Sequence, residues 1–486
     1  MARLSAADSL SSASARPALA GGLLRKLAGY SAMRGSAEAL VGLRGILLAT
    51  LLGPTAFGSW ALLRLATRYA ALAGLGMFRG LEVELLQAPD DGANRSRTSG
   101  AALGFMLAVS GALAAVALVA GALAESSTHR LILQGFAAAV IAEAVYGYAL
   151  VATRVGASLR HYALLETGTA ALHLVLGVTL ARPFGLPGAF AALALSSGVG
   201  AAVAGRWVEM RPRIDLMAVR GMLAAGLPVA LTGVAGTLLQ TADRWVVAAW
   251  GGHELLGYYA FGAALASVGA ALALSVRTVV FPAVYGDAKL AGAAAALQRH
   301  LERSLLPFAT LVPPVLGALG AVIGPAVALV APGYAAAVAP ARLFLLSGAA
   351  MGLVNLATIG AVAARRQTLL PAYAAGALVV NLGLASLALA AGLGLEGAAA
   401  ASLAGYAAFA AAVLRLNARQ GGILQPEQLV VRALRPLVWC AAAVTVAGHI
   451  AAALRMDAAA VGIYFVLLLP LLPRCRGEWR RLKGER

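Results

Sequence analysis

The sequence predicts an all-α polytopic membrane protein, and three features carry that prediction. Of the 486 residues, 61% are hydrophobic and only 12% are charged, which is too little polar surface for a soluble chain of this length. Apolar stretches of about 20 residues, the length that crosses a bilayer as a helix, recur along the chain. The basic residues fall almost entirely on one side of the topology that these stretches define.

Fourteen such stretches define the expected membrane-spanning helices. In chain order they are 30–52, 56–79, 100–123, 131–153, 160–181, 186–206, 219–250, 255–282, 304–330, 338–363, 369–391, 395–415, 432–454 and 458–473. Because an even number of crossings returns the chain to its starting side, both termini are expected on the cytoplasmic side.

The positions of arginine and lysine test this topology. With the N-terminus inside, 28 of the 38 basic residues lie in cytoplasmic segments, and the outer loops hold only Arg130, Arg182 and Arg455. This asymmetry is the one expected of a multi-pass protein in a bacterial-type inner (cytoplasmic) membrane. It also explains the net charge of +18 as topology, so no nucleic-acid partner is expected.

Two pairs of segments indicate an internal repeat. LRGILLATLLGPTAFGSWAL (43–62) and DRWVVAAWGGHELLGYYAF (243–261) each run from an arginine to a glycine and then into a second helix. FGLPGAFAALALSSG (184–198) and LGLEGAAAASLAGYA (393–407) share G-L-x-G-A before a helix of small residues. The first six and the next six helices are therefore expected to be parallel copies of one bundle, a plan typical of alternating access around a central binding site.

These boundaries divide the chain into seven parts. They are a disordered cytoplasmic tail (1–29), an N-lobe of six helices (30–206), a cytoplasmic linker (207–218), a C-lobe of six helices (219–415), a second linker (416–431), two appended helices (432–473) and a basic cytoplasmic tail (474–486).

The short segments between helices argue against an enzyme. No predicted outer loop is long enough for a soluble domain, and the sequence has no cluster of carboxylates and histidines for acid–base chemistry. Cys440 and Cys475 form neither a disulfide framework nor a metal-ligand pattern, and there is no phosphate-binding GxxxxGK[ST] loop. Transporters, channels and scaffolds remain, and the repeat favours a transporter.

Together the segments resemble the polysaccharide branch of the multidrug/oligosaccharidyl-lipid/polysaccharide exporter superfamily, the flippases for O-antigen and related lipid-linked oligosaccharides. The matching features, in order between about residues 30 and 415, are LLGPTAFGSWAL, GLPVALTGVAGTLLQTADRWVVAAWGGHELLGYYAFG, VVFPAVYGD, APGYAAAVAPARLFLL and NLGLASLALAAGLGLEGAAAASL. The resemblance implies two six-helix lobes around a cavity that opens alternately to either side of the membrane. It also implies that the two appended helices help to form a groove for the lipid, as in the related lipid II flippases.

Seven arginines remain inside the predicted helices. Three lie near helix ends, where the side chain reaches the interface: Arg34, Arg277 and Arg342. The other four lie about 9 to 18 Å below the outer helix ends at 1.5 Å per residue: Arg44, Arg64, Arg68 and Arg244. Facing lipid, each would cost about 2.5–3.5 kcal/mol on insertion scales, so we expect them to face an aqueous cavity or counter-ions.

These four arginines form the predicted substrate site. Arg64 and Arg68 share one helix face, whereas Arg44 and Arg244 are equivalent in the two lobes and are expected to approach each other across the cavity. Guanidinium groups offer paired donors that match phosphate oxygens, which suggests that they bind the diphosphate of a lipid-linked oligosaccharide.

The alternative is that the arginines lock helices together by pairing with acids: Glu38, Glu143, Glu166 and Asp243. Both interpretations stand for Arg244, which adjoins Asp243. Binding is favoured for Arg64 and Arg68, which have no acid nearby in the sequence.

Asp243 and Asn381 are candidates for a coupling site that takes Na⁺ or H⁺. Related flippases place a cation site in the second lobe, but the neighbouring charge of Arg244 argues against a cation at Asp243. No other cofactor and no metal site is expected.

The sequence thus predicts a flippase that moves a polyprenyl-diphosphate-linked oligosaccharide from the inner to the outer leaflet for polysaccharide export. One competitor is a multidrug or cation antiporter of the same superfamily, disfavoured because deep arginines outnumber buried acids. Another is a membrane enzyme of glycan assembly, disfavoured by the short outer loops. The expected partners are the lipid-linked oligosaccharide, membrane lipids, and a glycan polymerase or glycosyltransferases.

Overall fold

The computed structural model describes residues 6–87, 92–267, 293–364 and 366–483, and within these ranges the chain is helical with no strand. This agrees with the predicted all-α class. A helix pairs all of its own backbone donors and acceptors except at its ends, which is what a chain must do in a solvent that offers no hydrogen bonds.

The helices of the first half are α1 (Ala6–Ala70), α2 (Met77–Gln87), α3 (Gly92–Leu123), α4 (Ser127–Gly156), α5 (Leu159–Ala204) and α6 (Leu216–Leu265). The second half forms α8 (Ala293–His300), α9 (Leu306–Val330), α10 (Val338–Ala363), α11 (Leu370–Ala390), α12 (Gly394–Gln420), α13 (Pro426–Ala453), α14 (Ala459–Leu468) and α15 (Leu472–Lys483). Short 3₁₀ turns join some of these: η1 (Ala71–Gly74), η3 (Pro332–Ala337), η4 (Gln367–Leu369) and η5 (Leu469–Leu471). A π-helical turn, η2 (Leu301–Leu305), joins α8 to α9.

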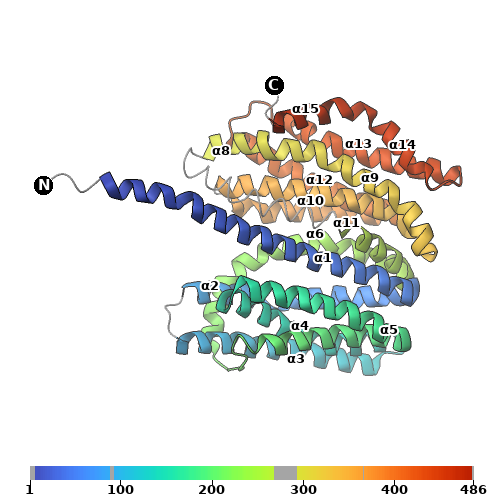
Figure 1. Cartoon of the computed structure of the whole chain (residues 1–486). Helices are drawn as coiled ribbons and strands as arrows, with labels where there is room; N and C mark the ends of the chain where they lie inside the picture. The colour runs from blue at the N-terminus through green and yellow to red at the C-terminus, as the bar shows by residue number, and fades with distance from the viewer. Residues whose placement is uncertain (1–5, 88–91, 268–292, 365, 484–486) are drawn as a thin grey trace.

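The helices form two groups with α1 and α6 between them (Figure 1). The helices α3, α4 and α5 pack against one another on one side, and α9, α10, α12 and α13 pack on the other. The two central helices contact each other extensively. This arrangement resembles the predicted pair of lobes, although the lobe boundaries stay a prediction.

Three long helices each join two predicted spans, and each breaks at a glycine with a positive φ. These are Gly53 in α1 (φ 75°), Gly185 in α5 (φ 59°) and Gly252 in α6 (φ 67°). Glycine adopts such angles without the steric penalty that a Cβ atom brings. Gly53 and Gly252 are also the glycines that end the first helical runs of the repeat, so the repeated sequence produces a repeated bend.

Ten helices in the described ranges are long and apolar enough to cross a membrane. Residues 35–74 and α5 each count as one such helix, although each holds two predicted spans. The predicted eighth helix, 255–282, lies partly outside the described residues. The total of fourteen therefore stays a prediction.

Three boundaries differ from the sequence-based expectation. Residues 6–29, expected to be a disordered tail, form the first part of α1, in a stretch rich in alanine and leucine, which favour helix. The second predicted span, 56–79, passes from α1 into η1 and ends at Gly74, because the chain then turns through Leu75 and Gly76 with positive φ. The last, 458–473, is interrupted by η5.

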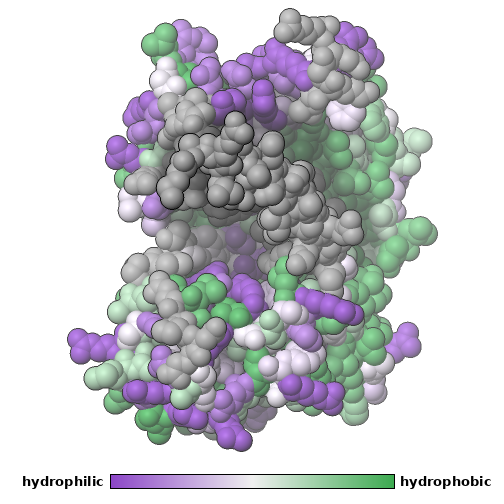
Figure 2. All heavy atoms as spheres, turned by 60° about the vertical axis from the view of Figure 1, so that its left-hand side comes forward, coloured by the Kyte–Doolittle hydropathy of each residue, from purple (hydrophilic) through white to green (hydrophobic). Residues whose placement is uncertain are grey.

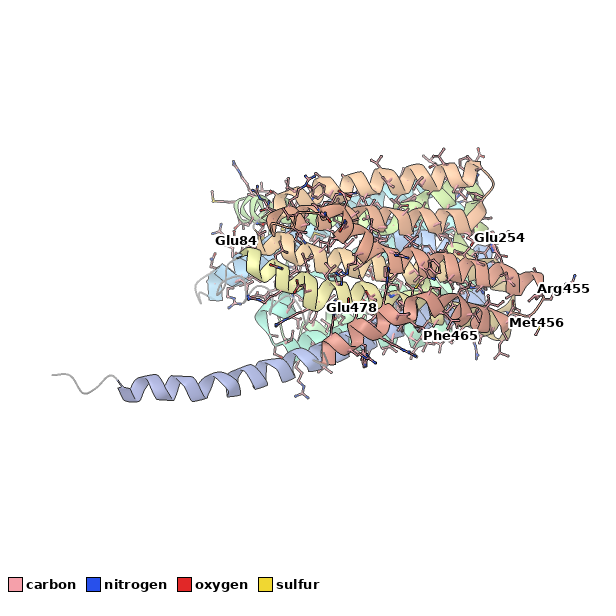
Figure 3. All side chains as sticks on the ribbon, turned by 90° about the horizontal axis from the view of Figure 1, so that it is seen from above. Glu84, Glu254, Arg455, Met456, Phe465 and Glu478 are labelled. Carbon is pink, nitrogen blue, oxygen red and sulfur yellow. The ribbon has the colours of Figure 1, made fainter. Side chains whose placement is uncertain are left out.

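The two ends of the helix bundle carry different predicted segments. Figure 3 shows Glu254 and Arg455, from predicted outer loops, at one end of the bundle. Glu84 lies at the opposite end, where α1 begins. This separation agrees with the order of the predicted loops, while the assignment of each end to a side of the membrane stays a prediction.

Candidate functional site

A cavity of about 890 Å³ lies between the two helix groups. The helices α1, α3 and α4 supply one wall, and α6, α10 and α12 supply the other. Figure 2 looks toward the end where α1 begins and shows the surface recessed between the two groups. A cavity in this position is what a two-lobe transporter requires.

Beyond the cavity, at the end that carries Glu254, α1 and α6 meet backbone to backbone. A Cβ atom added to Gly58 would lie 1.6 Å from the carbonyl oxygen of His253, and one added to Gly257 would lie 1.9 Å from the carbonyl oxygen of Pro54. Only glycine permits such close approach of two main chains. The two helix groups are therefore in contact at this end of the cavity.

All four predicted arginines line this cavity: Arg44, Arg64, Arg68 and Arg244. The first three lie on α1, on both sides of its bend at Gly53. Arg244 lies on α6, before the bend of that helix at Gly252. The structure thus brings together side chains that are 200 residues apart in sequence. Their role in binding a substrate stays a proposal.

Arg44 is buried, with 5% of its surface exposed, where α1 packs against α5. Its Nη1 donates a hydrogen bond to Nδ1 of His173, with the two atoms 2.6 Å apart. The guanidinium carbon lies 5.3 Å from the centre of the Trp60 ring, within the range of a cation–π interaction. No acid forms an ion pair with Arg44 in the part of the chain that the structure describes.

Arg64 has an acidic partner that the sequence did not place beside it. Its Nη1 lies 3.3 Å from Oε2 of Glu143 on α4, and Oε1 of Glu143 accepts a hydrogen bond of 2.7 Å from Ser197 on α5. For this arginine the structure supports part of the alternative interpretation, because Glu143 was one of the proposed counter-ions. The pair faces the cavity, and both side chains remain about one-third exposed.

Arg68 and Arg244 are neighbours across the cavity. Arg68 donates a hydrogen bond of 3.1 Å to Oε1 of Gln240, one turn before Arg244 on α6. The charge of Arg244 is close enough to interact with that of Arg68, as is the charge of Arg64. Neither Arg68 nor Arg244 forms an ion pair with any residue that the structure describes.

The four cations therefore form a row in which Arg44 interacts with Arg64, Arg64 with Arg68, and Arg68 with Arg244. The charged neighbours of Arg44 and Arg244 in this row are Arg64 and Arg68, and the expected direct approach of Arg44 to Arg244 stays a prediction. Like charges at this spacing repel one another. An anion in the cavity would relieve that repulsion.

Asp243 does not neutralise its neighbour Arg244. It is buried and accepts hydrogen bonds from the hydroxyl of Tyr259 (2.7 Å), the hydroxyl of Ser402 (2.6 Å) and the main-chain N–H of Arg244 (2.9 Å). An ion pair between the Asp243 carboxylate and the Arg244 guanidinium, which the alternative interpretation allowed, is absent from the ion pairs of the described residues. Asp243 instead ties α6 to α12.

Asn381, the second candidate for a coupling site, lies in α11 and is fully buried. Its Nδ2 donates to the carbonyl oxygen of Leu239 over 3.3 Å, and its Oδ1 has no hydrogen-bond partner among the residues described. Asp243 and Asn381 therefore form hydrogen bonds with different partners, and no hydrogen bond joins the two among the described residues. Of the two, only Asp243 lines the cavity.

The sequence prediction missed His173. It also missed the hydroxyl groups that donate to Glu143 and Asp243. A signal was present for His173, because Glu166, Thr169 and His173 recur at helical spacing on one face of an otherwise apolar helix. For Tyr259 and Ser402 no signal was present, since their contact with Asp243 depends on how α6 and α12 pack.

Comparison with known proteins gives one family match and several structural matches. Residues 47–332 match the profile of a family described as polysaccharide biosynthesis protein. No curated protein matches the chain in sequence. The lipid II flippase MurJ, in an inward closed conformation, has a TM-score of 0.67 and 12% identity, covering 93% of this chain and 98% of that chain.

A multidrug resistance MATE family transporter of the MOP superfamily, in an inward-facing conformation, has a TM-score of 0.62. It is 15% identical, and the match covers 82% of this chain and 96% of that chain. An outward-facing structure of such a transporter has a TM-score of 0.53, also with 15% identity, over 84% and 96% of the two chains. At these identities the similarity shows a shared membrane fold.

Proposed function

The chain belongs to the polysaccharide biosynthesis protein family, and from this premise we propose that it is a flippase for a polyprenyl-diphosphate-linked oligosaccharide. In this proposal it moves the lipid from the inner to the outer leaflet of the cytoplasmic membrane by alternating access, for export of a polysaccharide such as O-antigen. The family match agrees with the resemblance predicted from the sequence. The fold shared with a lipid II flippase supports the choice of a lipid-linked substrate.

The row of four arginines in one cavity is the observation that carries this proposal. Only Arg64 has an ion-pair partner among the described residues, so the other three guanidinium groups are free of a salt bridge there. A diphosphate carries several oxygen acceptors within a few ångströms, which suits guanidinium groups that donate in pairs. The cavity volume is in the range of sites that enclose a small ligand, enough for a diphosphate with its first sugars.

The same charges disfavour a multidrug or cation antiporter. A cationic drug requires acidic or aromatic groups to offset its charge. Three acids line the cavity against four arginines: Glu38, Glu143 and Asp243. Glu143 is paired with Arg64, and Asp243 accepts three hydrogen bonds. An anionic ligand is therefore favoured over a cationic one, and binding with transport is favoured over catalysis.

A coupling ion is part of the proposal, and Asp243 and Asn381 are its candidate residues. The unpartnered Oδ1 of Asn381 is the kind of buried oxygen that a cation or a proton donor satisfies. Na⁺ binding at Asp243 would require the Tyr259 and Ser402 hydroxyls to turn their oxygen atoms toward the ion. No resident cofactor is proposed. The proposed partners are membrane lipids, a glycan polymerase and the glycosyltransferases that build the substrate.

Mass spectrometry of polyprenyl-diphosphate glycans, extracted from cells with and without this gene, tests the proposal. The same lipids are measured after complementation with wild type, with Arg44→Ala/Arg244→Ala, and with Arg455→Ala as a control that removes one arginine at the end of the bundle. We expect one lipid-linked oligosaccharide to accumulate without the gene. Wild type and the Arg455 control should clear it, and the double variant should not. If no such lipid accumulates in cells that have no second exporter, the flippase function is wrong.

A further inference from the structure

Arg44 is the most deeply buried of the four cavity arginines, and its side chain is held by a histidine instead of an acid. We infer that His173 is a positioning residue for the anion site: it fixes the Arg44 guanidinium in the cavity wall without adding a negative charge of its own. The charge of Glu143 also acts on Arg44, but its ion pair is with Arg64. This inference rests on the proposed function, because it assigns a role to His173 in binding the same diphosphate.

The direction of the hydrogen bond determines the form of the histidine ring. Every N–H of a guanidinium donates, so Nδ1 of His173 is the acceptor and carries no proton. The ring proton then lies on Nε2, which is buried and has no hydrogen-bond partner in the described ranges. His173 is thus a neutral imidazole.

The neighbouring pair shows what an acid does in the same wall. Glu143 lies beside Arg64 and is itself fixed by Ser197, so its negative charge offsets that of Arg64 whether or not an anion is present. A substrate phosphate must compete with this carboxylate for the guanidinium. No such competition exists at Arg44, because an imidazole accepts one hydrogen bond and contributes no negative charge.

The packing around Arg44 also indicates that uncharged side chains hold its guanidinium in place. The Trp60 ring lies over the guanidinium and His173 accepts from Nη1, while Nε of Arg44 has no partner among the described residues. Gly177, one turn beyond His173 on α5, lies beside the stem of this side chain: a Cβ atom there would lie 3.9 Å from Cγ of Arg44, an ordinary contact. Arg44 therefore has a fixed stem and unused donor capacity.

Substitution of His173 by asparagine and by aspartate separates positioning from charge. The two side chains have the same shape, and each can place an oxygen near the position of Nδ1. Asparagine keeps a neutral acceptor, whereas aspartate adds a negative charge beside Arg44, which would compete with a bound anion. His173→Leu removes the acceptor, and Gly177→Ala is a matched control on the same helix, because its Cβ would make only ordinary contacts.

The experiment measures binding of farnesyl diphosphate, and of farnesol as an uncharged control, to the full chain in detergent. We expect His173→Asn and Gly177→Ala to bind the diphosphate within about threefold of wild type. His173→Asp and His173→Leu should bind it about tenfold or more weakly, since one charge-assisted hydrogen bond is worth about that factor. Binding of farnesol should not change in any variant.

Thermal unfolding of the same proteins distinguishes this role from a structural one. The His173→Asp protein should unfold at a temperature no lower than that of His173→Asn, because aspartate forms an ion pair with Arg44, yet it should bind the anion less well. If affinity follows thermal stability across the variants, or if Asp and Asn bind equally, His173 has no such role.

The Arg44→Ala variant in the same assay distinguishes a failure of the proposed anion site from a failure of the role inferred for His173. If wild type does not bind the diphosphate, or if Arg44→Ala binds it as well as wild type does, the proposed anion site fails. If Arg44→Ala loses affinity while His173→Asp does not, the site stands and only the inference about His173 is wrong.

Discussion

Gly58 of α1 and Gly257 of α6 lie in direct main-chain contact, each five residues after the glycine at which its helix bends. The nitrogen of Gly257 would lie 2.9 Å from a Cβ atom on Gly58, and that of Gly58 would lie 3.2 Å from one on Gly257. Two equivalent positions of the repeat thus meet each other, which is expected when two copies are related by an axis that passes between them.

This contact predicts the effect of a single methyl group. In Gly58→Ala the new Cβ would lie 1.6 Å from the His253 carbonyl oxygen, so the two helices must separate. We expect the unfolding free energy to fall by about 1–3 kcal/mol, the usual cost of overpacking. The cavity should also become more accessible from this end.

A cysteine introduced at Ala260, which lines the cavity, reports that accessibility in a chain whose Cys440 and Cys475 are replaced by alanine. A membrane-impermeant thiol reagent added outside should label it faster in the Gly58→Ala background. Gly236→Ala, where the new Cβ has open space, is the control and should leave the rate unchanged. Equal labelling in both backgrounds would show that the glycine contact does not close this end.

Removal of Glu143 should strengthen anion binding and slow transport. In Glu143→Gln the side-chain oxygen can still accept from Ser197, but the charge that offsets Arg64 is gone. We expect several-fold tighter binding of farnesyl diphosphate and slower clearance of the lipid-linked glycan from cells, because release becomes harder. Weaker binding would indicate that Glu143 orients Arg64 instead of competing for it.

Arg68 and Arg44 should differ in what their loss does to the fold. Arg68 is exposed in the cavity and its only hydrogen-bond partner among the described residues is Gln240, so Arg68→Ala should weaken diphosphate binding with little change in stability. Arg44→Ala leaves His173 buried without its donor, at a cost of about 1–3 kcal/mol. Denaturant or thermal unfolding beside the binding measurement checks both, and equal destabilisation by the two changes would contradict the assignment.

Asp243→Asn tests the candidate coupling site. The substitution removes a buried charge that accepts three hydrogen bonds, and we expect a loss of about 1–3 kcal/mol of stability. If the site takes Na⁺, wild type should unfold at a higher temperature in NaCl than in choline chloride, and the difference should vanish in Asp243→Asn and in Asn381→Leu. A difference that persists in both variants places the ion elsewhere.

The link between α3 and the start of α6 predicts a pH effect outside the membrane. The pKa of Asp215 is lowered first by its hydrogen bond with Arg97 and then by the main-chain N–H of Ala218, which it caps. A carboxyl whose pKa is depressed on folding stabilises the protein above its unfolded pKa of about 3.9, and that contribution is lost as the pH falls through the folded value. The Asp215→Asn variant, which still caps the helix, should lose less thermal stability than wild type between pH 6 and pH 3.

The sequence was sufficient for the features that depend on local pattern. Hydropathy and charge position predicted the helical class. The repeat placed the bends at Gly53 and Gly252, and the cost of burying charge singled out the four arginines that share one cavity. Each of these follows from residues that act within one helix or at one depth.

The sequence did not predict which side chains of different helices contact one another. Glu143 was considered among several acids, but its pairing with Arg64 depends on how α4 packs against α1. An ion pair of Asp243 with Arg244 was one of two interpretations, whereas the carboxylate accepts hydrogen bonds from Tyr259 and Ser402. A single sequence gives the depth of a side chain but not the angle at which its helix faces its neighbours.

Translocation by the purified full chain in proteoliposomes tests the central claim most directly. The substrate is a fluorescent polyprenyl-diphosphate disaccharide, and an impermeant quencher reports how much of it has reached the outer leaflet. We expect translocation by wild type and by Arg455→Ala, and none above protein-free vesicles when Arg44, Arg68 and Arg244 are replaced by alanine. Equal translocation by wild type and the triple variant would contradict the claim that these arginines carry the diphosphate across the membrane.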